Sequence, residues 1–153
     1  MKVKLEKHEL EICENIGKLR NEANRKFNVI NAKRCNLNND EINTIGFIAE
    51  FAFCKKFNLF PDFDIIPRSG TYDGKTKNGT RYDIKATNRL NGNLIATSKI
   101  NKDVDVYILA IVNNNEVDFV GWVNKDEFIK DANLKNLGYG NSYFLHREKL
   151  NKF

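Results

Sequence analysis

The chain is poor in the residues that build histidine or cysteine sites. Its 153 residues include two histidines, three cysteines and two prolines. The cysteine count is odd and no C-x-x-C spacing occurs, so we expect neither a disulfide framework nor a zinc site. His8 and His146 share no ligand spacing, so we expect no histidine metal site or catalytic triad. Any chemistry must therefore come from carboxylates and lysines.

Long apolar runs are also absent. The first residues, MKVKLEKHELE, lack the apolar core of a signal peptide, and no run approaches the length that crosses a bilayer. We expect a cytoplasmic protein without a membrane partner, and the excess of Asn and Lys over Gly and Pro is compatible with an AT-rich viral or phage genome. A hydrophobic fraction of 41% is ordinary for a globular protein. The length predicts a single domain over 1–153.

Positive charge is concentrated in the middle of the chain. The net charge is +5, but the segment from Arg68 to Lys102 has eight basic and only two acidic residues, a net of +6. The rest of the chain therefore sums to −1. A basic segment of this kind is compatible with a polyanionic partner, and a hairpin that is simply rich in lysine is the alternative.

Hydrophobic periodicity predicts two amphipathic helices, from Lys4 to about Phe27 and from after Asn39 to about Phe57. The two prolines that follow fit a loop with a short edge strand. Strands are predicted at 71–76, 80–87, 94–97, 106–112 and 117–123, then a short helix at 125–130 and an apolar patch at 143–145. This order predicts an α+β fold, α/β/α-like, with a mixed or antiparallel sheet of about five strands flanked by helices.

The strand with the sequence YDIKAT, residues 82–87, places a carboxylate and an ammonium on one surface. Side chains alternate along a strand, so the even-numbered residues can enter the core while Asp83, Lys85 and Thr87 point the other way. The acid and the base are then two residues apart on the same face.

The preceding hairpin brings a second acid into register. If Gly79 takes a left-handed conformation in a three-residue loop, Thr76 pairs with Thr80, and Asp73 lies opposite Asp83. Two facing carboxylates repel each other unless a cation lies between them. Mg²⁺ takes oxygen ligands and keeps several waters, so this pair of aspartates is suited to it.

An acid-x-Lys tripeptide is a weak signal alone, because about two are expected by chance in a chain of this composition. Two occur, DGK at 73–75 and DIK at 83–85. The first could be combined with the Pro-Asp pair at 61–62, and this alternative register stays open. We favour the second because Ile84 is a strand former between apolar neighbours, whereas Gly74 weakens a strand.

Glu50 is the candidate acid of the second helix. It shares a helical stripe with Gly46, Phe53 and Phe57, one step from the apolar face. Carboxylates rarely approach a core unless they are paired or bind metal. A surface or capping role is the alternative.

Taken in order, three segments resemble a known superfamily. GFIAEFAFCKKFN, then YDG, then RYDIKAT resemble the helix, second strand and third strand of PD-(D/E)XK nucleases, which include many restriction enzymes and archaeal Holliday junction resolvases. The resemblance covers about 42–123, and the spacings of 23 residues from Glu50 to Asp73 and 10 from Asp73 to Asp83 are closest to resolvase-like members. Tyr72 replaces the usual Pro, and Asp83 the usual Glu.

This resemblance implies a restriction-endonuclease-like fold and an active site made of Glu50, Asp73, Asp83 and Lys85. It implies that Asp73, Asp83 and the Ile84 carbonyl hold Mg²⁺, for which Mn²⁺ can substitute, and that Glu50 binds the ion directly or through water. Lys85 would position or activate the attacking water.

The implied function is a Mg²⁺-dependent DNA endonuclease, and a two-fold homodimer, with the first helix as one candidate interface, would suit double-strand cuts. The alternatives are a non-catalytic DNA-binding module of the same fold and a nuclease acting on RNA or single-stranded ends. Candidate DNA contacts are the basic and hydroxyl residues Arg68, Lys75, Lys77, Arg81, Thr87, Arg89, Ser98, Lys99 and Lys102.

Overall fold

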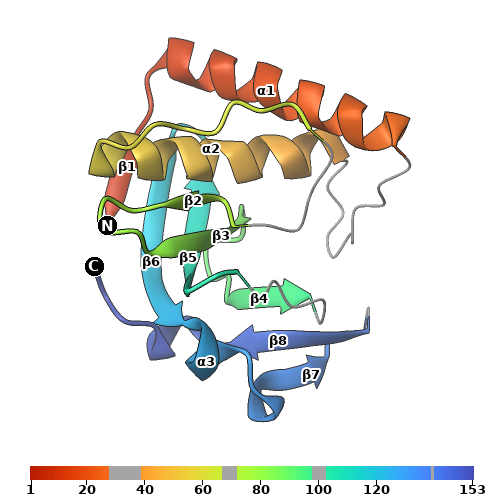
Figure 1. Cartoon of the computed structure of the whole chain (residues 1–153), viewed down its shortest axis with the longest axis vertical. Helices are drawn as coiled ribbons and strands as arrows, with labels where there is room; N and C mark the ends of the chain where they lie inside the picture. The colour runs from red at the N-terminus through yellow and green to blue at the C-terminus, as the bar shows by residue number, and fades with distance from the viewer. Residues whose placement is uncertain (28–38, 67–71, 98–102, 139) are drawn as a thin grey trace.

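Figure 1 shows the computed structural model, which describes residues 1–27, 39–66, 72–97, 103–138 and 140–153. The elements in chain order are β1 (Lys2–Lys4), α1 (Lys7–Lys26), α2 (Asn39–Phe57), β2 (Gly74–Lys75), β3 (Arg81–Thr87), β4 (Leu94–Thr97), β5 (Val106–Asn113), β6 (Glu116–Asn124), α3 (Lys125–Phe128), β7 (Leu134–Asn136) and β8 (Asn141–Leu145), with short 3₁₀ helices at Asp131–Asn133 and Arg147–Lys149.

The main sheet is mixed and has the strand order β1-β6-β5-β3-β2. β3 and β5 run parallel, and the other neighbours are antiparallel. Helix α2 lies on one face of this sheet, with α1 stacked on α2 (Figure 1). Phe47, Ala49 and Phe53 of α2 bury this face against Ile84 and Ile108. The predicted α+β class and mixed sheet of five strands are confirmed.

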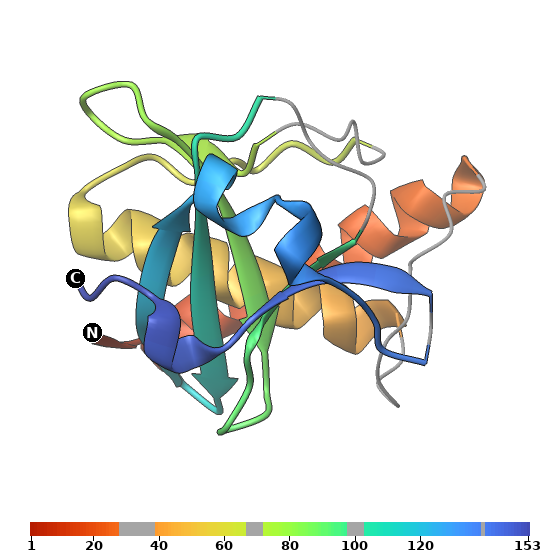
Figure 2. The same cartoon turned by 90° about the horizontal axis from the view of Figure 1, so that it is seen from below.

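The other face of the main sheet is covered mainly by a second sheet. β4, β8 and β7 form this three-stranded sheet, and Figure 2 shows β8 and α3 in front of the main strands with α2 behind them. Leu94 and Tyr143 pack there with Tyr107 and Leu109 of β5, and Phe128 of α3 joins them. The expectation that helices flank both faces was therefore wrong for this face. Among the described residues, α3 is the only α-helix that packs on it, and the second sheet covers the rest.

The strand composition of the main sheet also differs from expectation. β4 was expected in this sheet, but it pairs with β8 from Leu94 opposite Leu145 to Thr97 opposite Ser142. The fifth strand is instead β1, whose Val3 pairs with Val117 of β6. The edge strand expected after α2 does not form within 59–66.

Helix α1 starts at Lys7, because Glu6 and Glu9 form a capping box in which the Glu6 N–H donates to Glu9 Oε2 at 2.7 Å. Its buried face only partly follows the apolar residues, since Ile16 packs against the core but Ile12 and Leu19 are 42% and 45% exposed. The residues it buries are Cys13, Gly17, Asn21 and Asn24.

Close contact between the helix backbones explains this choice. A Cβ atom on Gly17 would lie 2.5 Å from Thr44 Oγ1 and 2.8 Å from Thr44 Cα, so only glycine fits there. Beyond Gly17, the Asn21 amide donates to the Asp40 carboxylate. The helices α1 and α2 therefore meet through a small residue and polar contacts.

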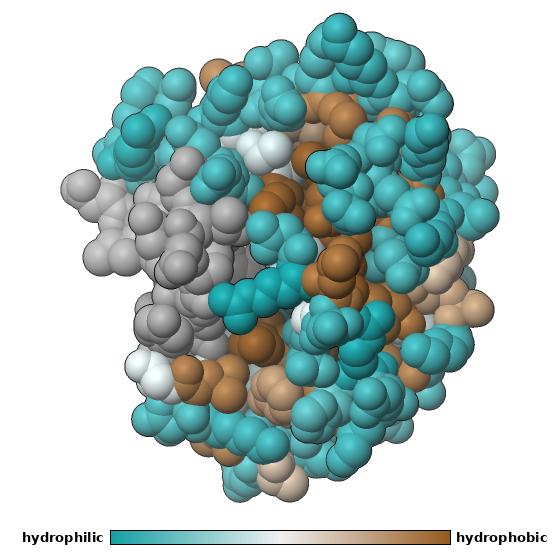
Figure 3. Space-filling model, turned by 180° about the vertical axis from the view of Figure 1, so that it is seen from behind, coloured by the Kyte–Doolittle hydropathy of each residue, from teal (hydrophilic) through white to brown (hydrophobic). Residues whose placement is uncertain are grey.

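The surface on the side away from the view of Figure 1 has both hydrophilic and apolar parts. Figure 3 shows the face opposite that of Figure 1, where apolar residues form a band through the middle between hydrophilic ends. None of the helices in the described ranges is long and apolar enough to cross a membrane.

Candidate functional site

The hairpin of β2 and β3 has the predicted register. Gly79 has a φ of 88°, and the Thr76 N–H donates to the Thr80 carbonyl at 2.9 Å. Gly74 pairs with Tyr82 and Lys75 with Arg81, which confirms the predicted register of the hairpin. Asp73 lies one residue before the first paired position of β2, and its direct opposition to Asp83 stays a prediction.

Asp73 continues the hydrogen-bond ladder where β2 ends. Its N–H donates to the Tyr82 carbonyl at 2.9 Å, and its carboxylate Oδ2 accepts the Ile84 N–H at 2.7 Å. The N–H and C=O of one strand residue point to the same side, so the Ile84 carbonyl faces this same edge. The edge therefore presents the Asp73 carboxylate and one strand carbonyl together.

Side chains of β3 alternate as predicted. Tyr82 and Ile84 are buried against α2, and Asp83 is buried on the opposite face with a relative exposure of 7%. Lys85 Nζ lies 2.6 Å from Asp83 Oδ1. This oxygen is buried, and the Lys85 ammonium balances its charge. A metal ion bound at this carboxylate would share it with Lys85.

Tyr107 lies beside the pair of Asp83 and Lys85. It is the register partner of Asp83 on β5, and its ring centroid lies 6.0 Å from Lys85 Nζ. Burial, with the negative charges of Asp83 and Asp73, raises the pKa of Tyr107 to about 12. The phenol is therefore neutral and supplies an apolar surface beside the lysine.

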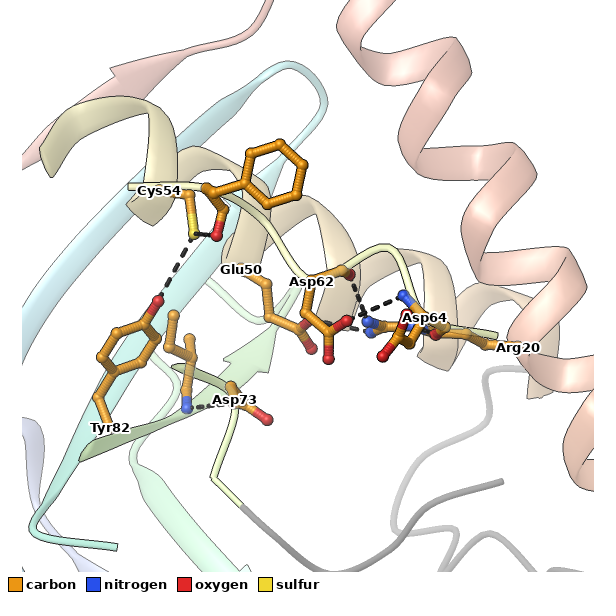
Figure 4. A network of polar contacts seen from close by, with 9 residues as sticks. Arg20, Glu50, Cys54, Asp62, Asp64, Asp73 and Tyr82 are labelled. Atoms are coloured by element: carbon orange, nitrogen blue, oxygen red, sulfur yellow. Dashed lines mark hydrogen bonds and ion pairs between the residues drawn. The ribbon is translucent and has the colours of Figure 1, made fainter. Parts of the chain in front are cut away.

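Glu50 on α2 is held by an arginine of α1. Arg20 Nη1 donates to Glu50 Oε2 at 2.9 Å, and both side chains are only 19% exposed. Figure 4 shows the Glu50 carboxylate between Arg20 and Asp73, with Asp62 nearby. Ion pairing with Arg20 therefore accounts for a carboxylate close to the core, and this partner was not among the roles expected for Glu50.

Arg20 is the site residue that sequence reasoning missed. It follows Cys13 and Gly17 at positions i+7 and i+3, so it belongs to the side of α1 that packs on α2. A helical stripe drawn through Gly17, rather than through the apolar residues of α1, would have included Arg20.

The three acids of the site repel one another. Desolvation raises the pKa of Asp73 well above its usual value, and the charges of Asp83 and Glu50 raise it further. The Lys85 ammonium and the Ile84 N–H act in the opposite direction but do not cancel these effects. A divalent cation at this edge would relieve the repulsion.

The residues fit Mg²⁺ with two carboxylates rather than three. No three His, Cys, Asp or Glu side chains within the described ranges are grouped closely enough to hold a metal. Mg²⁺ is commonly bound by one or two carboxylates, with water and substrate phosphate completing its shell. Asp73, Asp83 and the Ile84 carbonyl are the candidate oxygen ligands of such a site, whereas Oε2 of Glu50 is engaged by Arg20.

The alternative register uses DGK at 73–75 with Asp62. Lys75 is exposed, with Nζ 5.2 Å from the Tyr72 ring centroid, and the Asp62 Oδ1 accepts the Asp64 N–H at 2.9 Å. A Cβ on Gly74 would lie 2.3 Å from the Tyr82 hydroxyl, which gives this glycine a packing role. The geometry favours the register of DIK at 83–85.

The predicted DNA contacts divide into four groups. Lys75, Lys77 and Arg89 are exposed, and Thr87 is half-buried, with its Oγ1 accepting the Arg89 N–H at 3.2 Å. Arg81 is committed to Asp105, with which it makes two side-chain hydrogen bonds of 2.6 and 3.0 Å. The others, Arg68, Ser98, Lys99 and Lys102, lie outside the described residues.

Comparison with known proteins adds a family. A family model described as a family of unknown function, DUF5843, matches residues 2–120. The chain belongs to this family. The DUF5843 match includes all four predicted site residues and ends within β6. No curated protein and no solved structure matches the chain.

Proposed function

We propose that the chain is a Mg²⁺-dependent DNA endonuclease of the PD-(D/E)XK type. The observation that carries the proposal is the cluster at the edge of β3, where the Asp73 carboxylate accepts the Ile84 N–H and the buried Asp83 lies beside Lys85. The charges of Asp83 and Glu50 both raise the pKa of Asp73, and a divalent cation would stabilise acids gathered in this way. The finer assignment to a restriction-endonuclease-like fold is part of this proposal.

Asp73, Asp83 and the Ile84 carbonyl would hold Mg²⁺, or Mn²⁺ in its place. The ion would supply an acidic water and charge neutralisation for a phosphodiester. The protein groups do the rest. Lys85 lies on the same face as Asp83, where its ammonium can hold a phosphate oxygen or orient a water. Asp73 is fixed by the Ile84 N–H, which sets the carboxylate at the edge.

Glu50 has a supporting role in this proposal. Its Oε2 atom is engaged by Arg20, so the carboxylate acts on the site by its charge or through a water rather than as a direct ligand. Lys75, Lys77 and Arg89 are the described exposed cations of the basic segment and would contact the DNA backbone.

The test is cleavage of several nucleic acids. The protein is incubated with supercoiled plasmid, linear duplex, single-stranded DNA, a four-way junction and RNA, with Mg²⁺, Mn²⁺ or EDTA. Asp83→Asn and Lys85→Ala are compared with the matched exposed variants Asp126→Asn and Lys130→Ala. We expect metal-dependent cleavage that both site variants abolish and both controls retain.

Two outcomes would overturn the proposal. Cleavage that survives Asp83→Asn and Lys85→Ala would remove the assignment of the site. Cleavage of no substrate with either metal would leave a binding module, which band-shift assays with the same substrates would then reveal. Preference for RNA or for single strands would replace duplex DNA as the substrate.

A two-fold homodimer is the proposed assembly for double-strand cuts. The exposed Ile12 and Leu19 on α1 support it, because they give this helix an apolar surface that its own domain leaves uncovered. Light scattering of the wild type beside Leu19→Lys measures it, and a monomer at micromolar concentration would count against it.

A further inference from the structure

One guanidinium joins three segments at the edge of the site. Arg20 of α1 donates from Nη1 to Glu50 Oε2 at 2.9 Å, from Nη2 to the Asp62 carbonyl at 2.7 Å and from Nε to the Asp64 carbonyl at 3.4 Å. Figure 4 shows the side chain reaching from α1 towards α2 and the segment after it. Each nitrogen of the fork therefore has its own acceptor.

The surroundings of this guanidinium are built for arginine. Its central carbon lies 4.7 Å from the centroid of the Phe47 ring, and the ring of Phe63 packs on Phe47 at 5.9 Å. A planar fork can stack on an aromatic ring and serve three separated acceptors, whereas a lysine ammonium is a single point of charge. Arg20 therefore has a geometric role that its charge alone does not provide.

The segment that Arg20 binds, residues 59–66, has no regular secondary structure. At its start, the Leu59 N–H donates to the Cys54 carbonyl at 2.9 Å, and the Cys54 thiol lies 3.8 Å from the Phe60 carbonyl. Further along, the segment is connected to the helices in two ways. Arg20 donates to two of its backbone carbonyls, and the Phe63 ring packs on Phe47. Phe60, at 86% exposure, contributes little packing. The position of this segment thus depends strongly on Arg20.

We propose that Arg20 is a positioning residue, which fixes the Glu50 carboxylate and the 59–66 segment relative to Asp73 and so makes α1 part of the active site. The catalytic consequence rests on the nuclease function proposed above. The structural consequence does not, because it concerns contacts within the chain. Arg20 partly offsets the charge of Glu50, so Asp73 and Asp83 are left to bind the metal.

Limited proteolysis tests the structural part without any substrate. Chymotrypsin cuts after exposed aromatic residues, but Pro61 protects the bond after Phe60, so the informative bond is the one between Phe63 and Asp64. In Arg20→Gln we expect cleavage at this bond to be about tenfold faster or more, because the segment loses its two charged hydrogen bonds to Arg20 and opens more often. Arg20→Lys should be cleaved at a rate between those of the wild type and Arg20→Gln. Arg25→Gln, on the exposed side of α1, should be cleaved at the wild-type rate.

Kinetics and metal binding test the functional part. At a temperature where all variants are folded, Arg20→Gln should lower kcat about tenfold or more with KM for DNA nearly unchanged. A double-mutant cycle with Glu50→Gln should be strongly non-additive, since Arg20 acts through Glu50. Binding of Mn²⁺, followed by calorimetry, should weaken in Arg20→Gln and not in Arg25→Gln.

The outcomes separate this inference from the proposed function. Unchanged proteolysis of Arg20→Gln would overturn the positioning role even if the enzyme is active. Additive effects of Arg20→Gln and Glu50→Gln on kcat would show that Arg20 does not act through Glu50. If the wild type cleaves no nucleic acid, the nuclease proposal fails, and the proteolysis and Mn²⁺ measurements still decide the role of Arg20.

Discussion

Lys85 Nζ lies 2.6 Å from Oδ1 of Asp83, so the lysine of the Asp-x-Lys tripeptide contacts its own acid. Strand alternation brings the two side chains to one face, and the Asp73 carboxylate lies at the strand edge between them, where it accepts the Ile84 N–H. Lys85 thus occupies the position in which a cation relieves the repulsion between Asp73 and Asp83. A metal ion and Lys85 would compete for one oxygen, which makes their roles separable.

The first prediction separates metal binding from chemistry. Lys85→Met should lose cleavage by about 100-fold or more, the scale of a lost electrostatic contact in a transition state. It should bind Mn²⁺ as tightly as the wild type or more tightly, because the competing ammonium is gone. Asp83→Asn should lose both cleavage and Mn²⁺ binding. Calorimetry and a plasmid assay measure the two effects, and loss of Mn²⁺ binding in Lys85→Met would contradict these roles.

The second prediction concerns stability without metal. The folded state raises the pKa of Asp73, so it binds a proton more tightly than the unfolded chain does, and stability falls as pH rises from the usual Asp range through this raised pKa. Asp73→Asn keeps an oxygen for the Ile84 N–H and removes the charge. In EDTA at pH 8 it should melt about 2–4 °C higher than the wild type, the shift expected for 1 kcal/mol in a domain of this size.

Two controls accompany Asp73→Asn. At pH 4 the variant and the wild type should melt closer together, because the wild-type carboxyl is then largely protonated. Adding Mg²⁺ at pH 8 should stabilise the wild type and not the variant. A variant that melts lower than the wild type at pH 8 in EDTA would mean that the carboxylate stabilises the fold.

Local signals predicted the hairpin and its acids. Gly79, with a positive φ, and the alternation of YDIKAT depend only on neighbouring residues, so the hairpin turn and the shared face of Asp83 and Lys85 could be read from the sequence. The same holds for β4, whose bounds, Leu94–Thr97, match the predicted range.

Pairings between distant segments could not be read in this way. β4 leaves the main sheet to pair with β8, and β3 and β5 then pair in parallel, with Asp83 beside Tyr107. No local pattern marks either choice. Arg20 and Glu50 are likewise on different helices, 30 residues apart, and only the packing of α1 on α2 brings them together.

The packing of α1 on α2 gives the third prediction. A Cβ on Gly17 would lie within 3 Å of the Thr44 backbone, so Gly17→Ala should force the helices apart and cost about 1–3 kcal/mol. A Cβ on Gly46 in α2 would meet no such atom within 4 Å, so this glycine serves as the matched control. Gly46→Ala should stabilise the protein by about 0.5–1 kcal/mol through helix propensity. Urea unfolding measures both, and equal effects would contradict the close approach at Gly17.

Because Gly17 is one turn from Arg20, this variant also reports on the site. If the helices separate, Arg20 should lose contact with Glu50, and chymotrypsin should cut faster after Phe63. Gly46→Ala should leave that rate unchanged.

The last prediction divides the basic segment into cations that bind DNA and one that holds the fold. The guanidinium and the backbone N–H of Arg81 both donate hydrogen bonds to the Asp105 carboxylate. This pairing lowers the pKa of Asp105 below its usual range. Arg81→Gln should therefore lower the melting temperature at neutral pH. Lys75 and Lys77 are exposed on the hairpin, so replacing both by alanine should leave the melting temperature unchanged and weaken DNA binding.

Salt dependence of duplex DNA binding provides the measurement. Each lost phosphate contact reduces the slope of log K against log salt by roughly 0.9, so Lys75→Ala with Lys77→Ala should reduce it by roughly 1–2. The control is the pair Lys130→Ala and Lys149→Ala, which removes the same charge from exposed positions outside the hairpin. An equal loss in both double variants would mean that net charge, rather than the hairpin, binds DNA. An unchanged slope in Lys75→Ala with Lys77→Ala would place the DNA contacts elsewhere in the chain.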